Sequence, residues 1–135
     1  MSTLAGDSPR VPESKLSPTA PVQSSELESI CSNALSTSVP SPSTTTYSHE
    51  STSTWTSILI SDILSKLTSS CSTHKFIVYA TFVHSPPAGL TGQTAVYTAA
   101  GAYWDADKDG LWTWSHTLGK ENDIHVIVTV TWIAK

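Results

Sequence analysis

Two stretches of the chain repeat apolar residues at the spacing of an α-helix. The first predicts a helix over 24–36, where Ser25 and Glu28 fit a capping box. The second and stronger stretch predicts a helix over 54–68, with Ser53 or Thr54 as its N-cap. The two apolar stripes are Leu27, Ile30, Cys31, Ala34 and Leu35, and Trp55, Ile58, Leu59, Ile63 and Leu67. Further apolar residues, Ile60 and Leu64, widen the second stripe, so we expect that helix to be well buried.

Strand-like patterns follow within 75–133. Residues 75–84 are apolar on both faces, which is typical of a central strand. Residues 93–104 are mostly small and include Gly101, which suits a strand that another backbone approaches closely. Shorter patterns predict strands over 111–117 and 124–133, and the last strand has one strongly apolar face. That face consists of Ile124, Val126, Val128, Val130 and Trp132.

Two helices followed by sequential strands predict an α+β fold, with two helices packed on one face of a four-stranded antiparallel sheet. The remaining segments are rich in Ser, Thr and Pro. Residues 1–23 have no apolar period and are predicted to be a disordered tail, because they bury too little surface to offset the entropy of ordering. Residues 37–53 are predicted to be a flexible linker within a domain that covers 24–135.

An acidic turn joins two aromatic runs at 103–114. Asp109 and Gly110 form a strong hairpin signal, so the runs around Trp104 and Trp112 are expected to be antiparallel neighbours. The three aspartates at 105, 107 and 109 also match the first half of an EF-hand loop, but its twelfth position is His116 instead of glutamate. A polar turn is therefore preferred to a calcium site, which stays as an alternative.

Composition excludes several classes of function. The chain of 135 residues has a net charge of −4, only 13% charged residues and no basic stripe, which argues against nucleic acid or an anionic membrane as a partner. Two cysteines, Cys31 and Cys71, are too few for a disulfide framework and favour a reduced, intracellular setting. Cys31 is expected in the core, and Cys71 is interpreted as an ordinary loop residue.

No arrangement of residues indicates catalysis. The sequence lacks a phosphate-binding glycine loop, a nucleophile elbow and zinc-ligand spacing. The five histidines are scattered, and only His116 and His125 are placed to become neighbours by pairing of the last two strands. The pattern therefore indicates a binding module, with no enzyme activity, metal or cofactor.

The order of these parts resembles the Tctex-type dynein light chains, and fungal members more than animal ones. The resemblance rests on the helix from Trp55, the Lys75-Phe76-Ile77-Val78 strand, Tyr103-Trp104-Asp105 with Asp109-Gly110, and the Val-rich last strand. It implies a non-catalytic homodimer in the cytoplasm, as part of the microtubule-associated dynein complex. It also implies that the strand at 93–104 crosses to complete the partner's sheet, and that the dynein intermediate chain adds to this sheet as a further strand.

By position, the resemblance assigns the binding of the intermediate chain to one strand edge and its neighbours. These residues are Phe76, Val78, Val96, Tyr97, Thr98, Ala99, Ala100 and Tyr103. The stretch between Gly89 and Trp104 is longer than usual for the family, which changes the alignment of this edge.

Two alternatives stay open: an adaptor for cargo or scaffold proteins that acts apart from dynein, and calcium binding through Asp105, Asp107 and Asp109.

Overall fold

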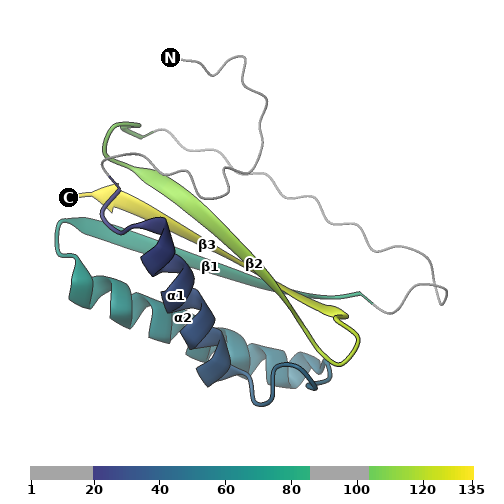
Figure 1. The fold of residues 1–135 in the computed structure, drawn as a ribbon. Helices are drawn as coiled ribbons and strands as arrows, with labels where there is room; N and C mark the ends of the chain where they lie inside the picture. Colours follow the sequence, from purple (N-terminus) through teal and green to yellow (C-terminus); the bar gives the residue numbers. More distant parts are fainter. Residues whose placement is uncertain (1–19, 86–103) are drawn as a thin grey trace, which may run out of the picture.

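The computed structural model of the chain describes residues 20–85 and 104–135. Helices α1 (Ser24–Ser38) and α2 (His49–Ser70) precede strands β1 (His74–His84), β2 (Gly110–Leu118) and β3 (Ile124–Ala134). The strands form an antiparallel sheet in the order β1-β3-β2, and both helices lie on one face of it (Figure 1). The predicted α+β fold with two helices on an antiparallel sheet is confirmed. The strand expected over 93–104 lies outside the described residues, apart from Trp104, which is not in a strand.

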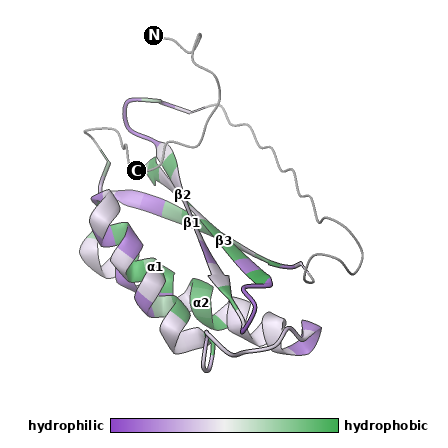
Figure 2. Ribbon diagram, turned by 45° about the vertical axis from the view of Figure 1, so that its right-hand side comes forward, coloured by the Kyte–Doolittle hydropathy of each residue, from purple (hydrophilic) through white to green (hydrophobic). Residues whose placement is uncertain are grey.

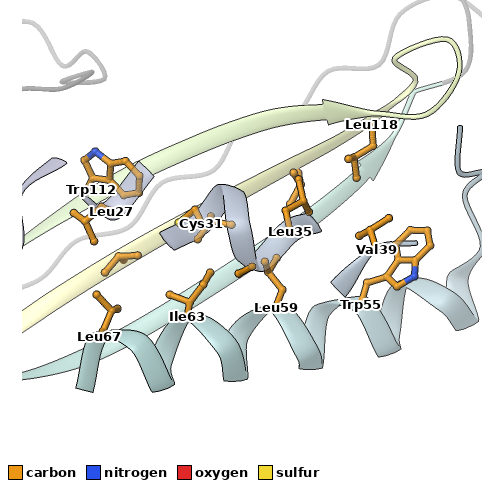
Figure 3. Packing of buried hydrophobic residues seen from close by; sticks show 14 of the residues in the cluster. Leu27, Cys31, Leu35, Val39, Trp55, Leu59, Ile63, Leu67, Trp112 and Leu118 are labelled. Carbon is orange, nitrogen blue, oxygen red and sulfur yellow. The ribbon is translucent and has the colours of Figure 1, made fainter. Parts of the chain in front are cut away.

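The core lies between the helices and the sheet. Leu27, Cys31 and Leu35 of α1 and Leu59, Ile63 and Leu67 of α2 point toward the strands (Figure 3). The last strand supplies the opposite wall, since its five predicted inward residues are all buried. They are Ile124, Val126, Val128, Val130 and Trp132. Burying each such side chain contributes about 1.5–3 kcal/mol to stability.

Among the described strands, β1 does not occupy the central position that was expected. Its apolar residues on both faces predicted a central strand, but β3 is the strand with a described neighbour on each side. β1 lies at an edge of the described sheet, paired with β3 from His74 opposite Ala134 to His84 opposite Ile124. Both helices lie on one face of the described sheet, so they do not explain why the other face of β1 is also apolar.

The helices also differ from their predicted limits. α2 begins at His49, well before position 54, because Ser48 is its N-cap and accepts a hydrogen bond from the Ser51 N–H (3.3 Å). No apolar period marks this first turn, so the pattern of hydrophobic residues did not reveal it. The predicted capping box at Ser25 is wrong, since Gln23 precedes α1 and makes no side-chain cap. Ile58 was placed on the buried stripe but is 41% exposed.

Two polar turns flank β2 and fix its ends. Figure 2 shows them as hydrophilic segments at the two ends of β2. The β2–β3 turn places Gly119 at φ +94° and Asn122 at φ 54°, and the Asn122 N–H donates to the Gly119 carbonyl (3.1 Å).

Within residues 20–85 and 104–135, neither helix is both long and apolar enough to span a membrane.

The end of β1 is tied to both neighbouring connections. His84 Nε2 lies 3.1 Å from Asp123 Oδ2 of the β2–β3 turn, and the His84 ring stacks on Tyr47 from the α1–α2 connection (centroids 5.0 Å apart). Next to it, the Ser85 N–H donates to the Asp123 carbonyl (2.7 Å). These contacts fix where the chain leaves β1 at the beginning of 86–103.

Candidate docking surface

The face of the sheet opposite the helices is uncovered by any described element. Alternation along each strand defines it, because residues next to the buried ones in sequence point to the other side. The strand register places them in rows across the sheet, for example Ile77, Thr131 and Leu111, then Tyr79, Thr129 and Thr113. We call this surface the outer face. It consists of Lys75, Ile77, Tyr79, Thr81, Val83, Leu111, Thr113, Ser115, Thr117, His125, Ile127, Thr129, Thr131 and Ile133.

The outer face carries the large apolar side chains that the described structure leaves most open. Ile77 is 54% exposed, Tyr79 63% and Leu111 44%. The Thr113 and Thr129 hydroxyls lie 3.4 Å apart and satisfy each other, so this part of the face holds little unsatisfied polarity. No charged side chain occupies the centre of this face. Lys75 lies at the end of β1 and therefore at the margin of the face. An apolar, β-branched and aromatic surface of this kind is suited to packing against another protein surface.

A hollow of about 600 Å³ marks one end of this face. Val83, Ser85, Ser115, His116, Thr117, His125 and Ile127 line it. His116 and His125 both border the hollow. The register pairs His125 with Thr117 and His116 with Val126, so the two histidines belong to opposite faces of the sheet. His116 also stacks on Trp114, with ring centroids 5.5 Å apart. The lining of the hollow therefore mixes polar and apolar side chains.

The edges of the sheet are a second feature of this surface. Each of β1 and β2 pairs with β3 on one side, and no described strand pairs with the other side. An edge strand presents N–H and C=O groups from alternate residues, which are available to a further strand. β2, the strand that carries Trp112 and Trp114, is therefore placed to pair with a further strand.

The predicted partner-binding residues divide into two groups. Phe76 and Val78 are on β1 but face the helices, where they are partly buried against the core opposite Trp132 and Val130. The other six, Val96, Tyr97, Thr98, Ala99, Ala100 and Tyr103, lie outside the described residues. Sequence reasoning missed Ile77, Tyr79 and Leu111. Alternation would have found them, since each is adjacent in sequence to an inward residue of its strand.

The acidic turn at 105–109 uses its carboxylates as internal acceptors. Asp105 Oδ1 accepts from the Asp107 N–H (3.0 Å), and Asp109 Oδ2 accepts from the Asp105 N–H (3.0 Å). Asp109 Oδ1 also accepts from the Ala134 N–H (2.7 Å), and this bond is the main reason that the pKa of Asp109 lies below its ordinary value. In the part of the chain that the structure describes, no group of three or more His, Cys, Asp or Glu side chains is arranged to hold a metal ion.

This arrangement defines a small α+β protein in which no described element covers the second face of the sheet or pairs with its two outer edges. Comparison with protein families gives the same class a name. The model of the Tctex-1 family matches residues 21–133, and the chain belongs to the Tctex-1 family. A search of curated proteins found no match. Family membership supports a dynein light-chain role.

Proposed function

We propose that the protein is a non-catalytic light chain of the cytoplasmic dynein motor, which dimerises and holds the dynein intermediate chain by β-strand addition. The observation that carries this proposal is the outer face, with Ile77, Tyr79 and Leu111 exposed on the side of the sheet away from the helices. A second copy of the chain is the occupant that we assign to it. Dimerisation would bury these side chains, and their hydrophobic contribution would be about 25 cal/mol for each Å² removed from water.

Strand exchange extends the same proposal. One edge of β2 pairs with no described strand, which supports this proposal, because a strand from the partner would give the backbone groups of that edge hydrogen-bond partners. We assign this role to residues 93–104 of the partner, and the intermediate chain would then add to the exchanged strand. Backbone hydrogen bonds would supply affinity, and side-chain pockets beside the strand would supply selectivity. The expected location is the cytoplasm, on the microtubule-associated dynein complex.

The test of dimerisation compares two substitutions of the same kind. Ile77→Asp places a charge on the outer face, whereas Ile58→Asp places one on α2, at a side chain of similar exposure (54% and 41%). Light scattering should show a dimer for the wild type and for Ile58→Asp. Ile77→Asp should weaken dimerisation by about tenfold or more, since a charge would have to be buried without a partner. A wild-type monomer would refute the dimer, and an unaffected Ile77→Asp dimer would refute this interface.

Calorimetric titration with a peptide from the disordered N-terminal region of the intermediate chain tests partner binding. We expect micromolar or tighter binding with two peptides per dimer, and weaker binding by the Ile77→Asp variant. A stable dimer that does not bind the peptide would favour the alternative adaptor role apart from dynein. Affinity purification from cells then separates these roles by whether the intermediate chain co-elutes.

A further inference from the structure

A histidine lies on the surface that we assign to dimerisation. His125 of β3 belongs to the outer face, and the strand register places it between Val83 of β1 and Thr117 of β2. Its side chain is half-buried and borders the hollow of about 600 Å³ at this end of the face. In a single copy of the chain, the hollow leaves the imidazole open to solvent. A second copy seated on the outer face would cover both the hollow and the imidazole.

The outer face provides no acidic partner for this imidazole. Among its described residues none is Asp or Glu, and Lys75 is the only one with a permanent charge. Lys75 is separated from Val83, the neighbour of His125, by roughly 27 Å along β1. Residues 93–104, to which the proposed function gives strand exchange, contain no charged residue either. Because a homodimer brings together two copies of the same surface, whatever part of the partner's face meets His125 also lacks a carboxylate.

The acid closest to His125 in the sequence is engaged by other groups. Asp123 Oδ2 lies 3.1 Å from His84 Nε2, and its Oδ1 lies against Gly119. The backbone carbonyl of Asp123 accepts a hydrogen bond from the Ser85 N–H (2.7 Å). His84 belongs to the helix side of the sheet, since it pairs with the buried residue Ile124. The Asp123 carboxylate therefore serves the end of β1 and its own turn.

The other titratable groups at this end of the sheet do not supply a compensating charge. His116 borders the same hollow, but it lies on the helix side and stacks on Trp114. Its protonation would add a second positive charge beside the hollow. Lys120 and Glu121 of the β2–β3 turn are exposed, and charges of that kind are well screened by water.

We propose that protonation of His125 dissociates the dimer, so that falling pH separates the two copies. This inference rests on the proposed function, because it concerns the same outer face. Histidine is the residue type whose charge ordinarily changes between about pH 5 and pH 8. A neutral imidazole can be covered by the apolar and hydroxyl-bearing side chains of a second copy. An imidazolium in the same place would lose its hydration without gaining a carboxylate.

Mass action gives the direction of the effect. A proton that binds the single copy but not the dimer shifts the equilibrium toward the single copy. The dimer is therefore favoured while His125 is neutral, and it weakens as pH falls through the range in which the imidazole becomes charged. Each dimer contains two copies of His125, and both contribute. Protonation of His84 acts in the opposite sense within one copy, since it strengthens the ion pair with Asp123.

Analytical ultracentrifugation of the full chain at constant ionic strength measures the dimer dissociation constant at each pH. For the wild type we expect this constant to rise about tenfold or more between about pH 8 and about pH 5.5. In His125→Gln the ratio of the two constants should fall to within about threefold, whatever the affinity at the higher pH. His125→Lys should dimerise weakly at both pH values. His49→Gln, at the exposed start of α2, is the matched control and should keep the wild-type response.

The outcomes separate this inference from the proposed function. A wild-type monomer at pH 8 would refute the proposed dimer itself. A wild-type dimer with the same dissociation constant at both pH values would refute the pH response alone. The assignment to His125 is wrong if His125→Gln keeps the full response or if His116→Gln removes it. Circular dichroism of the same samples follows the fold, and a loss of helix at low pH in both the wild type and His125→Gln would assign the response to unfolding.

Discussion

Asp109 binds the last strand from a position 25 residues earlier in the chain. Its Oδ1 accepts a hydrogen bond from the Ala134 N–H at 2.7 Å, while its Oδ2 accepts from the Asp105 N–H at 3.0 Å. One carboxylate thus closes its own turn and fixes that turn to the end of β3. The acidic residues before β2 therefore have a structural role as acceptors within this turn.

Substitution of Asp109 should therefore destabilise the fold. Asp109→Ala removes both acceptors and should lower the thermal midpoint by several degrees, and Asp109→Asn should lower it less, because an amide oxygen still accepts one bond. The folded-state pKa of Asp109 is depressed, so its contribution is present above its ordinary pKa of 3.8 and is lost as pH falls through the folded value. Thermal melts across the acid range should show a shallower acid limb for Asp109→Ala. An acid limb identical to that of the wild type would contradict this role.

Cys31 should make stability decrease at alkaline pH. Its pKa is raised by burial to about 12 from 9.0, so the folded state keeps the thiol neutral while the unfolded state ionises. Stability is fully present below pH 9.0 and falls by about 1.4 kcal/mol per pH unit until the folded pKa is reached. Denaturant titrations at several alkaline pH values measure this slope. Cys31→Ala should be less stable at neutral pH, by about 1–2 kcal/mol, but should lack the slope. Persistence of the full slope in that variant would assign it to other groups.

Gly110 should be intolerant of any side chain. A Cβ at this position would lie 2.8 Å from Trp132 Cζ2, because the indole of β3 crosses over the paired glycine of β2. Gly110→Ala should lower the free energy of unfolding by about 1–3 kcal/mol, since the buried indole would have to move. A double-mutant cycle with Trp132→Leu isolates the contact. We expect the alanine to cost markedly less when the indole is absent. Additive effects would mean that the backbone, and not the indole, requires glycine.

Some features were determined by the sequence alone. The alternation from Ile124 to Trp132 fixed which face of β3 is buried, because a period of two admits only one inward set. The helical stripes likewise identified Leu27, Cys31, Leu59 and Ile63 as core residues. The α+β class followed from the order of these patterns, and the resemblance to a known family followed from the motifs after Trp55.

Other features depended on contacts between residues distant in sequence. The start of α2 at Ser48 is set by a capping hydrogen bond, which leaves no trace in apolar periodicity. The place of β1 at an edge of the described sheet is set by strand order, and only that order shows that described elements leave Ile77 and Tyr79 uncovered. The contact of His74 Nε2 with the Lys108 carbonyl oxygen likewise required the turn at Lys108 to meet the start of β1. Local patterns determine which side of an element is buried, whereas tertiary pairing decides what lies beside it, because long-range contacts are not encoded in residue spacing.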